Sequence, residues 1–151
     1  MTSSYKVYPP LSWRCAMFTH YLYWSSTILL STLYLLSAAL YLTKQTWVRE
    51  TLRELHYPAP YLVPFMIIIK ILGPIAIISR VSLPLSDLAY AGLFFHLILS
   101  GMAHLGVRKP LVALPAVIGL VLLVVSFSTQ NSARAHPSPY GEMMVNVLTT
   151  H

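Results

Sequence analysis

The chain has 151 residues, of which 56% are hydrophobic and only 9% are charged. Soluble domains carry about 25% charged residues, so this composition and a mean hydropathy of +0.66 exclude an ordinary water-soluble domain. The net charge of +6 comes from ten scattered basic residues, which form no basic stripe of the kind that nucleic-acid-binding proteins present. Basic residues at membrane edges would instead meet anionic headgroups. We therefore expect a lipid bilayer, and not nucleic acid, as the main partner of the chain.

Residues 1–19 have a mixed composition and lack the pattern of charge, apolar run and cleavage site that defines a signal peptide. We expect them to form an N-terminal tail that leads into an interfacial turn. They contain the single cysteine of the chain, Cys15. One cysteine excludes both an intrachain disulfide and a dithiol mechanism within one chain.

Four long apolar segments follow, at about residues 21–42, 61–79, 85–105 and 111–127. Each is close to the roughly 20 residues that cross a bilayer as a helix, and the runs are too continuous for barrel strands. The sequence therefore predicts an all-α, polytopic four-helix bundle over residues 20–128, which makes the chain a multi-pass integral membrane protein. A polar tail follows at residues 129–151. Basic residues divide too evenly between the two sides to predict an orientation.

A short amphipathic segment separates the first two spans. Val48, Leu52 and Leu55 follow the spacing i, i+4, i+7 and share one helix face. Trp47 and the neighbouring charged residues are typical of a membrane interface. We expect a short interfacial helix here.

One face of the first span carries a seam of small, polar and aromatic side chains. Its members recur in steps of three and four: His20, Trp24, Thr27, Ser31, Tyr34, Ala38 and Tyr41. Such a seam packs against neighbouring helices and offers hydroxyl groups. Packing alone and the lining of a ligand site both remain open.

The second span contains a lysine close to mid-depth. Pro74 lacks an N–H, so the carbonyl of Lys70 loses its usual helical partner, and Gly73 leaves room beside it. An ionisable group at the bilayer centre costs several kcal/mol by insertion scales and usually faces the bundle interior. We therefore expect Lys70 to face inward.

The third span carries a stripe of Gly92, His96, Ser100 and His104 at four-residue spacing. His96 and His104 would be about 12 Å apart along the helix, which excludes their binding one metal ion or one haem iron together. No metal site is predicted. Asp87 follows Ser86 at the start of this span, where it would cap the first helical turn or pair with Arg80.

Several of these polar residues have similar depths in the bilayer, at which they could hydrogen-bond an oxygen of an apolar ligand. The candidates for catalysis are Lys70, His96, Tyr34 and Asp87, and those for substrate binding are Thr27, Ser31, Tyr41, Ser100 and His104.

The stretches "LHYPAPYLVPFMIIIKILGPIAII" and "SDLAYAGLFFHLILSGMAHL" resemble the DoxX-like family of small four-helix membrane proteins. The resemblance covers about residues 19–127. It rests on the turn Tyr57–Pro58, Lys70 with Leu72 and Gly73, Asp87 with the AYAG run at 89–92, and His104. Where the family pattern usually has an acidic residue after that run, this chain has His96, so an acid–lysine pair is not expected.

The resemblance implies a role beside membrane oxidoreductases, in some cases linked to quinones, or in biosynthesis. Three functions stay open. The first is an oxidoreductase component that acts on or near a lipophilic, quinone-like molecule, with electrons from an unidentified cofactor or a partner redox enzyme. The second is a cofactor-free isomerase, cyclase or hydratase for a terpenoid or polyketide of a biosynthetic pathway. The third is a non-catalytic scaffold subunit.

Overall fold

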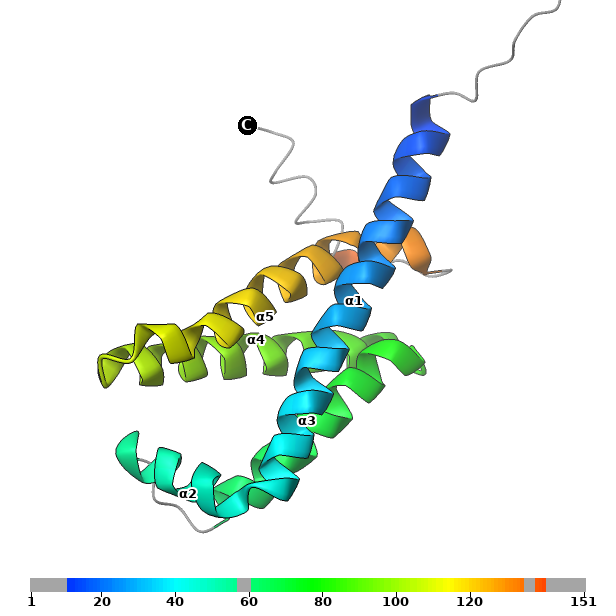
Figure 1. The fold of residues 1–151 in the computed structure, drawn as a ribbon. Helices are drawn as coiled ribbons and strands as arrows, with labels where there is room; N and C mark the ends of the chain where they lie inside the picture. Colours follow the sequence, from blue (N-terminus) through cyan, green and yellow to red (C-terminus); the bar gives the residue numbers. More distant parts are fainter. Residues whose placement is uncertain (1–10, 57–60, 135–137, 141–151) are drawn as a thin grey trace, which may run out of the picture.

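The structure, a computed structural model, describes residues 11–56, 61–134 and 138–140. All regular structure in these ranges is helical, which confirms the predicted fold class. The elements are α1 (Leu11–Thr43), α2 (Gln45–Glu54), α3 (Leu62–Ser79), α4 (Leu83–Gly106), α5 (Pro110–Thr129) and the short 3-10 helix η1 (Gln130–Ala133). Figure 1 shows their arrangement.

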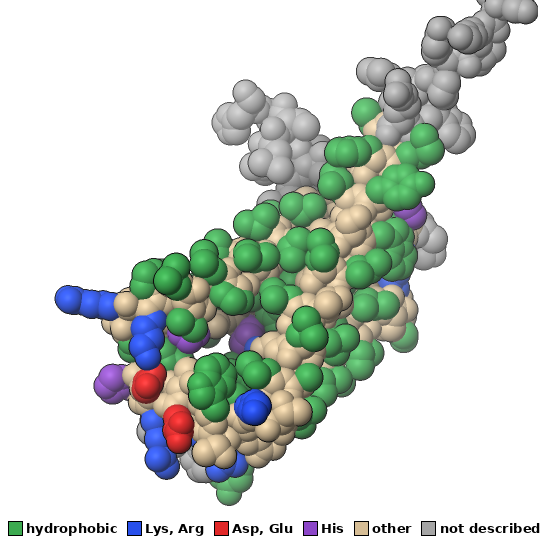
Figure 2. All heavy atoms as spheres, in the orientation of Figure 1, with side chains coloured by type: hydrophobic (Ala, Val, Ile, Leu, Met, Phe, Trp, Pro, Cys, Tyr) green, Lys and Arg blue, Asp and Glu red, His purple; other side chains and the backbone are tan. Residues whose placement is uncertain are grey.

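Four helices are long and apolar enough to cross a membrane: α1 from Cys15 onward, α3, α4, and α5 together with η1. Large apolar side chains cover their outer faces, and Leu36, Leu72 and Leu99 are each more than half exposed. Figure 2 shows this apolar surface along the helices. An apolar surface of this extent matches a lipid environment rather than water. The protein is therefore a multi-pass integral membrane protein.

The first helix begins earlier than the sequence analysis expected. It starts at Leu11 and so includes much of the segment that was predicted as a tail. The reason is that residues 11–57 contain neither proline nor glycine, so nothing in the sequence interrupts the helix. The rest of the predicted tail, residues 1–10, lies outside the described residues.

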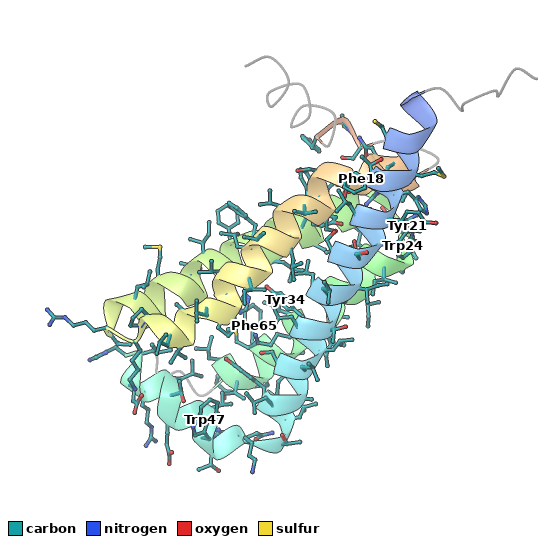
Figure 3. The ribbon with its side chains drawn as sticks, turned by 45° about the horizontal axis from the view of Figure 1, so that its top comes forward. Phe18, Tyr21, Trp24, Tyr34, Trp47 and Phe65 are labelled. Carbon is teal, nitrogen blue, oxygen red and sulfur yellow. The ribbon has the colours of Figure 1, made fainter. Side chains whose placement is uncertain are left out.

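The four spanning helices close into a ring. α1 packs against α3 and α5, and α4 packs against the same two helices, so α1 and α4 face each other across the bundle. The N-terminal end of α1 and the C-terminal end of α5 lie at one end of the bundle, and α2 lies at the other (Figure 1). Toward the α2 end, the α4–α5 hairpin diverges from α1 and α3 (Figures 1 and 3).

The predicted interfacial helix is present as α2. Val48 and Leu52 are buried against Val63 of α3, whereas Trp47 is exposed. Lys109, which precedes α5, forms a salt bridge of 2.6 Å with Glu54 at the end of α2. These contacts hold α2 beneath the open end of the bundle. The Tyr57–Pro58 turn lies outside the described residues.

Two glycines allow close helix packing near the bundle centre. A Cβ at Gly73 of α3 would lie 2.7 Å from the Leu93 side chain of α4. A Cβ at Gly119 of α5 would lie 2.8 Å from Leu97 and 3.1 Å from Leu33. Small residues at such crossings let membrane helices approach closely. Gly73 is less than one helical turn from Lys70, so this approach brings Lys70 close to α4.

Candidate functional site

A hydrogen bond crosses the centre of the bundle between the two opposite helices. Tyr34 of α1 is buried, and its hydroxyl lies 3.0 Å from Nδ1 of His96 on α4. The same hydroxyl donates to the Leu93 carbonyl at 3.4 Å. Both contacts form together when His96 carries its proton on Nδ1 and donates it to the phenol oxygen. In that tautomer Nε2 of His96 is an acceptor, and it is buried without a partner among the described residues.

Lys70 lies near this hydrogen bond and is supplied by a third helix, α3. Its side chain is only 6% exposed, so it faces the bundle interior, as expected. Its Nζ lies 5.4 Å from the centroid of the Tyr34 ring and 4.9 Å from that of Tyr41. The salt bridge among the described residues joins Lys109 and Glu54, so no described carboxylate pairs with Lys70. Aromatic faces, rather than a carboxylate, therefore stabilise the buried ammonium.

This polar centre is open on one side. Figure 2 shows a hollow between α1 and the α4–α5 hairpin, in which histidine and basic side-chain atoms are visible below the apolar surface. Figure 3 shows Tyr34 directed from α1 toward α4 and α5. The hollow lies on the side of the bundle where the α4–α5 hairpin diverges from α1 (Figures 1 and 2).

The predicted site residues separate into groups. Tyr34, Tyr41, Lys70 and His96 come together at the centre. Ser31 is buried about one helical turn from Tyr34. Ser100 and His104 lie further along α4 toward α2 and are half-buried, and Nδ1 of His104 is buried without a described partner.

Asp87 does not join the centre, and the expectation that it caps a helix is wrong. α4 begins at Leu83, with Pro84 in its first turn, so Asp87 already lies in the second turn. Its Oδ2 accepts a hydrogen bond of 2.9 Å from the Ser138 hydroxyl. Its carboxylate lies more than 4.0 Å from the Arg80 guanidinium, so the alternative ion pair is also not formed.

Thr27 belongs to a second polar cluster, nearer the end where α1 begins. The hydroxyl of Ser126 on α5 lies 2.6 Å from Thr27 Oγ1 and 2.7 Å from the Tyr90 hydroxyl of α4. These three side chains are almost fully buried and join three helices. Thr27 lies about 10 Å along α1 from Tyr34.

An apolar layer separates the two polar regions. Leu30, Ile77 and Leu93 are each 1% exposed and pack together in the main core cluster. The central site is therefore bounded on this side by apolar side chains.

Sequence reasoning missed the members of the second cluster on α4 and α5. Ser86, Tyr90, Leu93 and Leu97 follow i, i+4, i+7, i+11 and form the buried face of α4. The spacing of Ser86 and Tyr90 was a signal for this face. The predicted histidine stripe lies beside this buried face. The sequence does not show which of the two stripes is buried, because both combine small, polar and apolar residues.

Four spanning helices around a buried lysine, a buried tyrosine and a half-buried histidine define a small polytopic membrane protein with a polar centre. A sequence model of the DoxX-like family matches residues 25–126. The match covers more than half of the chain, which belongs to the DoxX-like family, as the resemblance indicated. No curated protein matches the chain. No solved structure matches it either.

Proposed function

We propose that the centre formed by Tyr34, Lys70 and His96 binds a lipophilic, quinone-like small molecule, and that the chain is a membrane oxidoreductase component acting on it. The proposal rests on one observation about the bundle centre. The bundle centre holds unused hydrogen-bonding capacity, because no described carboxylate pairs with Lys70 and Nε2 of His96 has no described partner. Buried polar groups without partners are rare in folded proteins. A bound ligand oxygen would supply the missing partners.

The two groups complement each other chemically. The Lys70 ammonium can only donate hydrogen bonds, and it would donate to a carbonyl oxygen of the ligand. Nε2 of His96 would accept from a hydroxyl group, which a quinol has and a quinone lacks. Reduction of a quinone to a quinol takes up two electrons and two protons. In this proposal Lys70 and His96 transfer the protons to and from the ligand oxygens, and a partner redox enzyme or its cofactor supplies the electrons.

The surroundings favour an apolar ligand with a polar head. The Tyr34 and Tyr41 rings flank the ammonium, and the apolar layer at Leu30, Ile77 and Leu93 bounds the centre. Binding sites for small molecules are commonly mostly apolar, with a few placed polar groups.

A second candidate function is a cofactor-free isomerase or cyclase for a terpenoid or polyketide. The observation that favours it is that one site holds both a donor, Lys70, and an acceptor, Nε2 of His96. Such a pair can remove a proton from one atom of a ligand and return one to another, with no electron transfer. The polar centre would be the same, and only the ligand would differ.

The test is ligand-dependent thermal unfolding of the full chain in a mild detergent. A short-chain benzoquinone is compared with the alkylbenzene that lacks its carbonyl oxygens. We expect the quinone alone to raise the unfolding midpoint of the wild type, of the core control Ile77→Val and of His96→Leu, because Nε2 of His96 bonds only a quinol hydroxyl. We expect no such rise in Lys70→Met, which lacks the donor to the carbonyl oxygen. Equal shifts in all four proteins, or no shift in the wild type, would contradict quinone binding. A shift with an enone but not with the quinone would favour the second candidate.

A further inference from the structure

Two arginines converge at the end of the bundle opposite α2. Arg80 follows α3, and its guanidinium carbon lies 4.8 Å from the ring centroid of Tyr23 and 4.6 Å from that of Trp24. Its Nη1 donates to the Ala133 carbonyl. Arg134 follows η1, and its Nη2 donates to the Ser86 hydroxyl at 2.6 Å. Both guanidinium groups are thereby held at the edge of the apolar spans.

Much of the hydrogen-bonding capacity at this end is unused. Nε and Nη2 of Arg80 and Nε of Arg134 are buried, and no described residue is their partner. The same holds for the Tyr23 hydroxyl and for both polar atoms of the Gln130 amide, in side chains that are 0% exposed. Buried donors in native structures are nearly always satisfied by protein, water or ligand. This concentration of unpartnered polar atoms, most of them donors, therefore indicates a bound group.

The charge of this end favours an anion. Asp87 is the acidic residue near the two arginines in the described part of the chain, and its carboxylate is not within 4.0 Å of either guanidinium. Its Oδ2 accepts a hydrogen bond from the Ser138 hydroxyl, and its Oδ1 is buried with no described partner. Among the described residues, the two arginines therefore have one neighbouring carboxylate, and it does not pair with them. Guanidinium groups match the oxygens of a phosphate in fork-like, two-bond geometry.

This end is separate from the central site. Tyr23 lies one helical turn from Thr27, whose hydroxyl contacts the Ser126 hydroxyl, and the apolar layer at Leu30 and Ile77 follows. The inference therefore does not depend on the proposed quinone site.

We propose that Arg80 and Arg134 bind a phosphate group at this end of the bundle, with Tyr23 and Gln130 as further hydrogen-bonding partners. The phosphate belongs to a phospholipid headgroup or to a free phosphate, since both present the same oxygens. The position at the end of the α3 and α5 spans is the depth at which lipid phosphates occur.

The test is thermal unfolding of the full chain in neutral detergent with three additions. These are phosphatidylglycerol, a galactolipid with the same acyl chains and no phosphate, and inorganic phosphate against chloride at equal ionic strength. We expect phosphatidylglycerol to raise the unfolding midpoint more than the galactolipid does. A rise with inorganic phosphate as well would identify free phosphate as a sufficient ligand. Equal effects of both lipids and no effect of phosphate would overturn the proposal.

The variants Arg80→Gln and Arg134→Gln should weaken the phosphate-dependent shift, with about a tenfold loss of affinity for each lost charged hydrogen bond. Arg108→Gln is the matched control. Arg108 has the same left-handed backbone as Arg80, with φ of 57° against 52°, and it is exposed at the opposite end of the bundle. If Arg80→Gln does not fold, Arg134→Gln alone is compared with the control Arg108→Gln. Loss of the shift in Arg108→Gln to the same extent would contradict a defined site.

Discussion

Lys70 is the charged residue at the centre of the proposed binding site. An ammonium near the middle of a bilayer costs free energy, and a carboxylate partner would offset this cost most simply. Here the ammonium lies over the rings of Tyr34 and Tyr41 instead. It therefore keeps donor capacity for a ligand oxygen, which a lysine engaged in an ion pair would have used.

The Tyr34–His96 hydrogen bond allows a prediction at the same scale. We expect a double-mutant cycle with Tyr34→Phe and His96→Leu to give a coupling energy of about 1 kcal/mol, the usual size for hydrogen bonds between membrane helices. The measurement is the free energy of unfolding in detergent with increasing denaturant. A coupling energy of zero would mean that the 3.0 Å contact does not stabilise the bundle.

At the scale of the helices, packing depends on positions where backbones approach closely. Gly119 of α5 faces side chains from both α4 and α1, namely Leu97 and Leu33. Since neighbours on two helices must move, Gly119→Ala should lower the free energy of unfolding by about 1–3 kcal/mol. Gly92→Ala is the matched control, because nothing lies within 4 Å of a Cβ there. Equal stabilities of the two variants would contradict the packing described for α5.

A second prediction at the scale of the helices concerns the docking of α2 against α3. Leu52 and Val48 are its buried side chains, so Leu52→Ala should detach α2 from α3, with a loss of about 2–5 kcal/mol of packing free energy. We expect faster tryptic cleavage after Arg49 and Arg53 than in the wild type. The exposed substitution Thr46→Ala should leave the cleavage rate unchanged. Cleavage at the wild-type rate in Leu52→Ala would show that α2 is held by other contacts.

At the scale of the whole molecule, the ring of four spans separates two ends of the bundle, which lie on opposite sides of the membrane. Lys44, beside α2, lies at one end, and Tyr140, beyond η1, lies at the other, and both are exposed. In a Cys15→Ser background, Lys44→Cys and Tyr140→Cys should react with a membrane-impermeant maleimide from opposite sides of sealed vesicles. Labelling of both from the same side would contradict the four-span topology.

The sequence predicted the spans and the inward lysine well, because length, hydropathy and the cost of a buried charge are local properties. It could not predict which polar residues meet. Thr27 was placed correctly on the inner seam of α1, but its partners Ser126 and Tyr90 lie on other helices. Asp87 was misplaced because α4 begins at Leu83, before the predicted start at residue 85, with Pro84 in its first turn. In lipid, an apolar outer face resembles an apolar inner face, so periodicity alone does not identify the buried side.

We propose above that the centre formed by Tyr34, Lys70 and His96 holds a lipophilic small molecule. The most direct test is mass spectrometry of the small molecules that co-purify with the full chain in a mild detergent, compared between the wild type, Lys70→Met and the core control Ile77→Val. We predict a quinone or a related oxygen-bearing lipophile in the wild type and in Ile77→Val that is lost from Lys70→Met. Bulk lipids alone, unchanged by Lys70→Met in a protein that still folds, would contradict the binding site and favour a scaffold role.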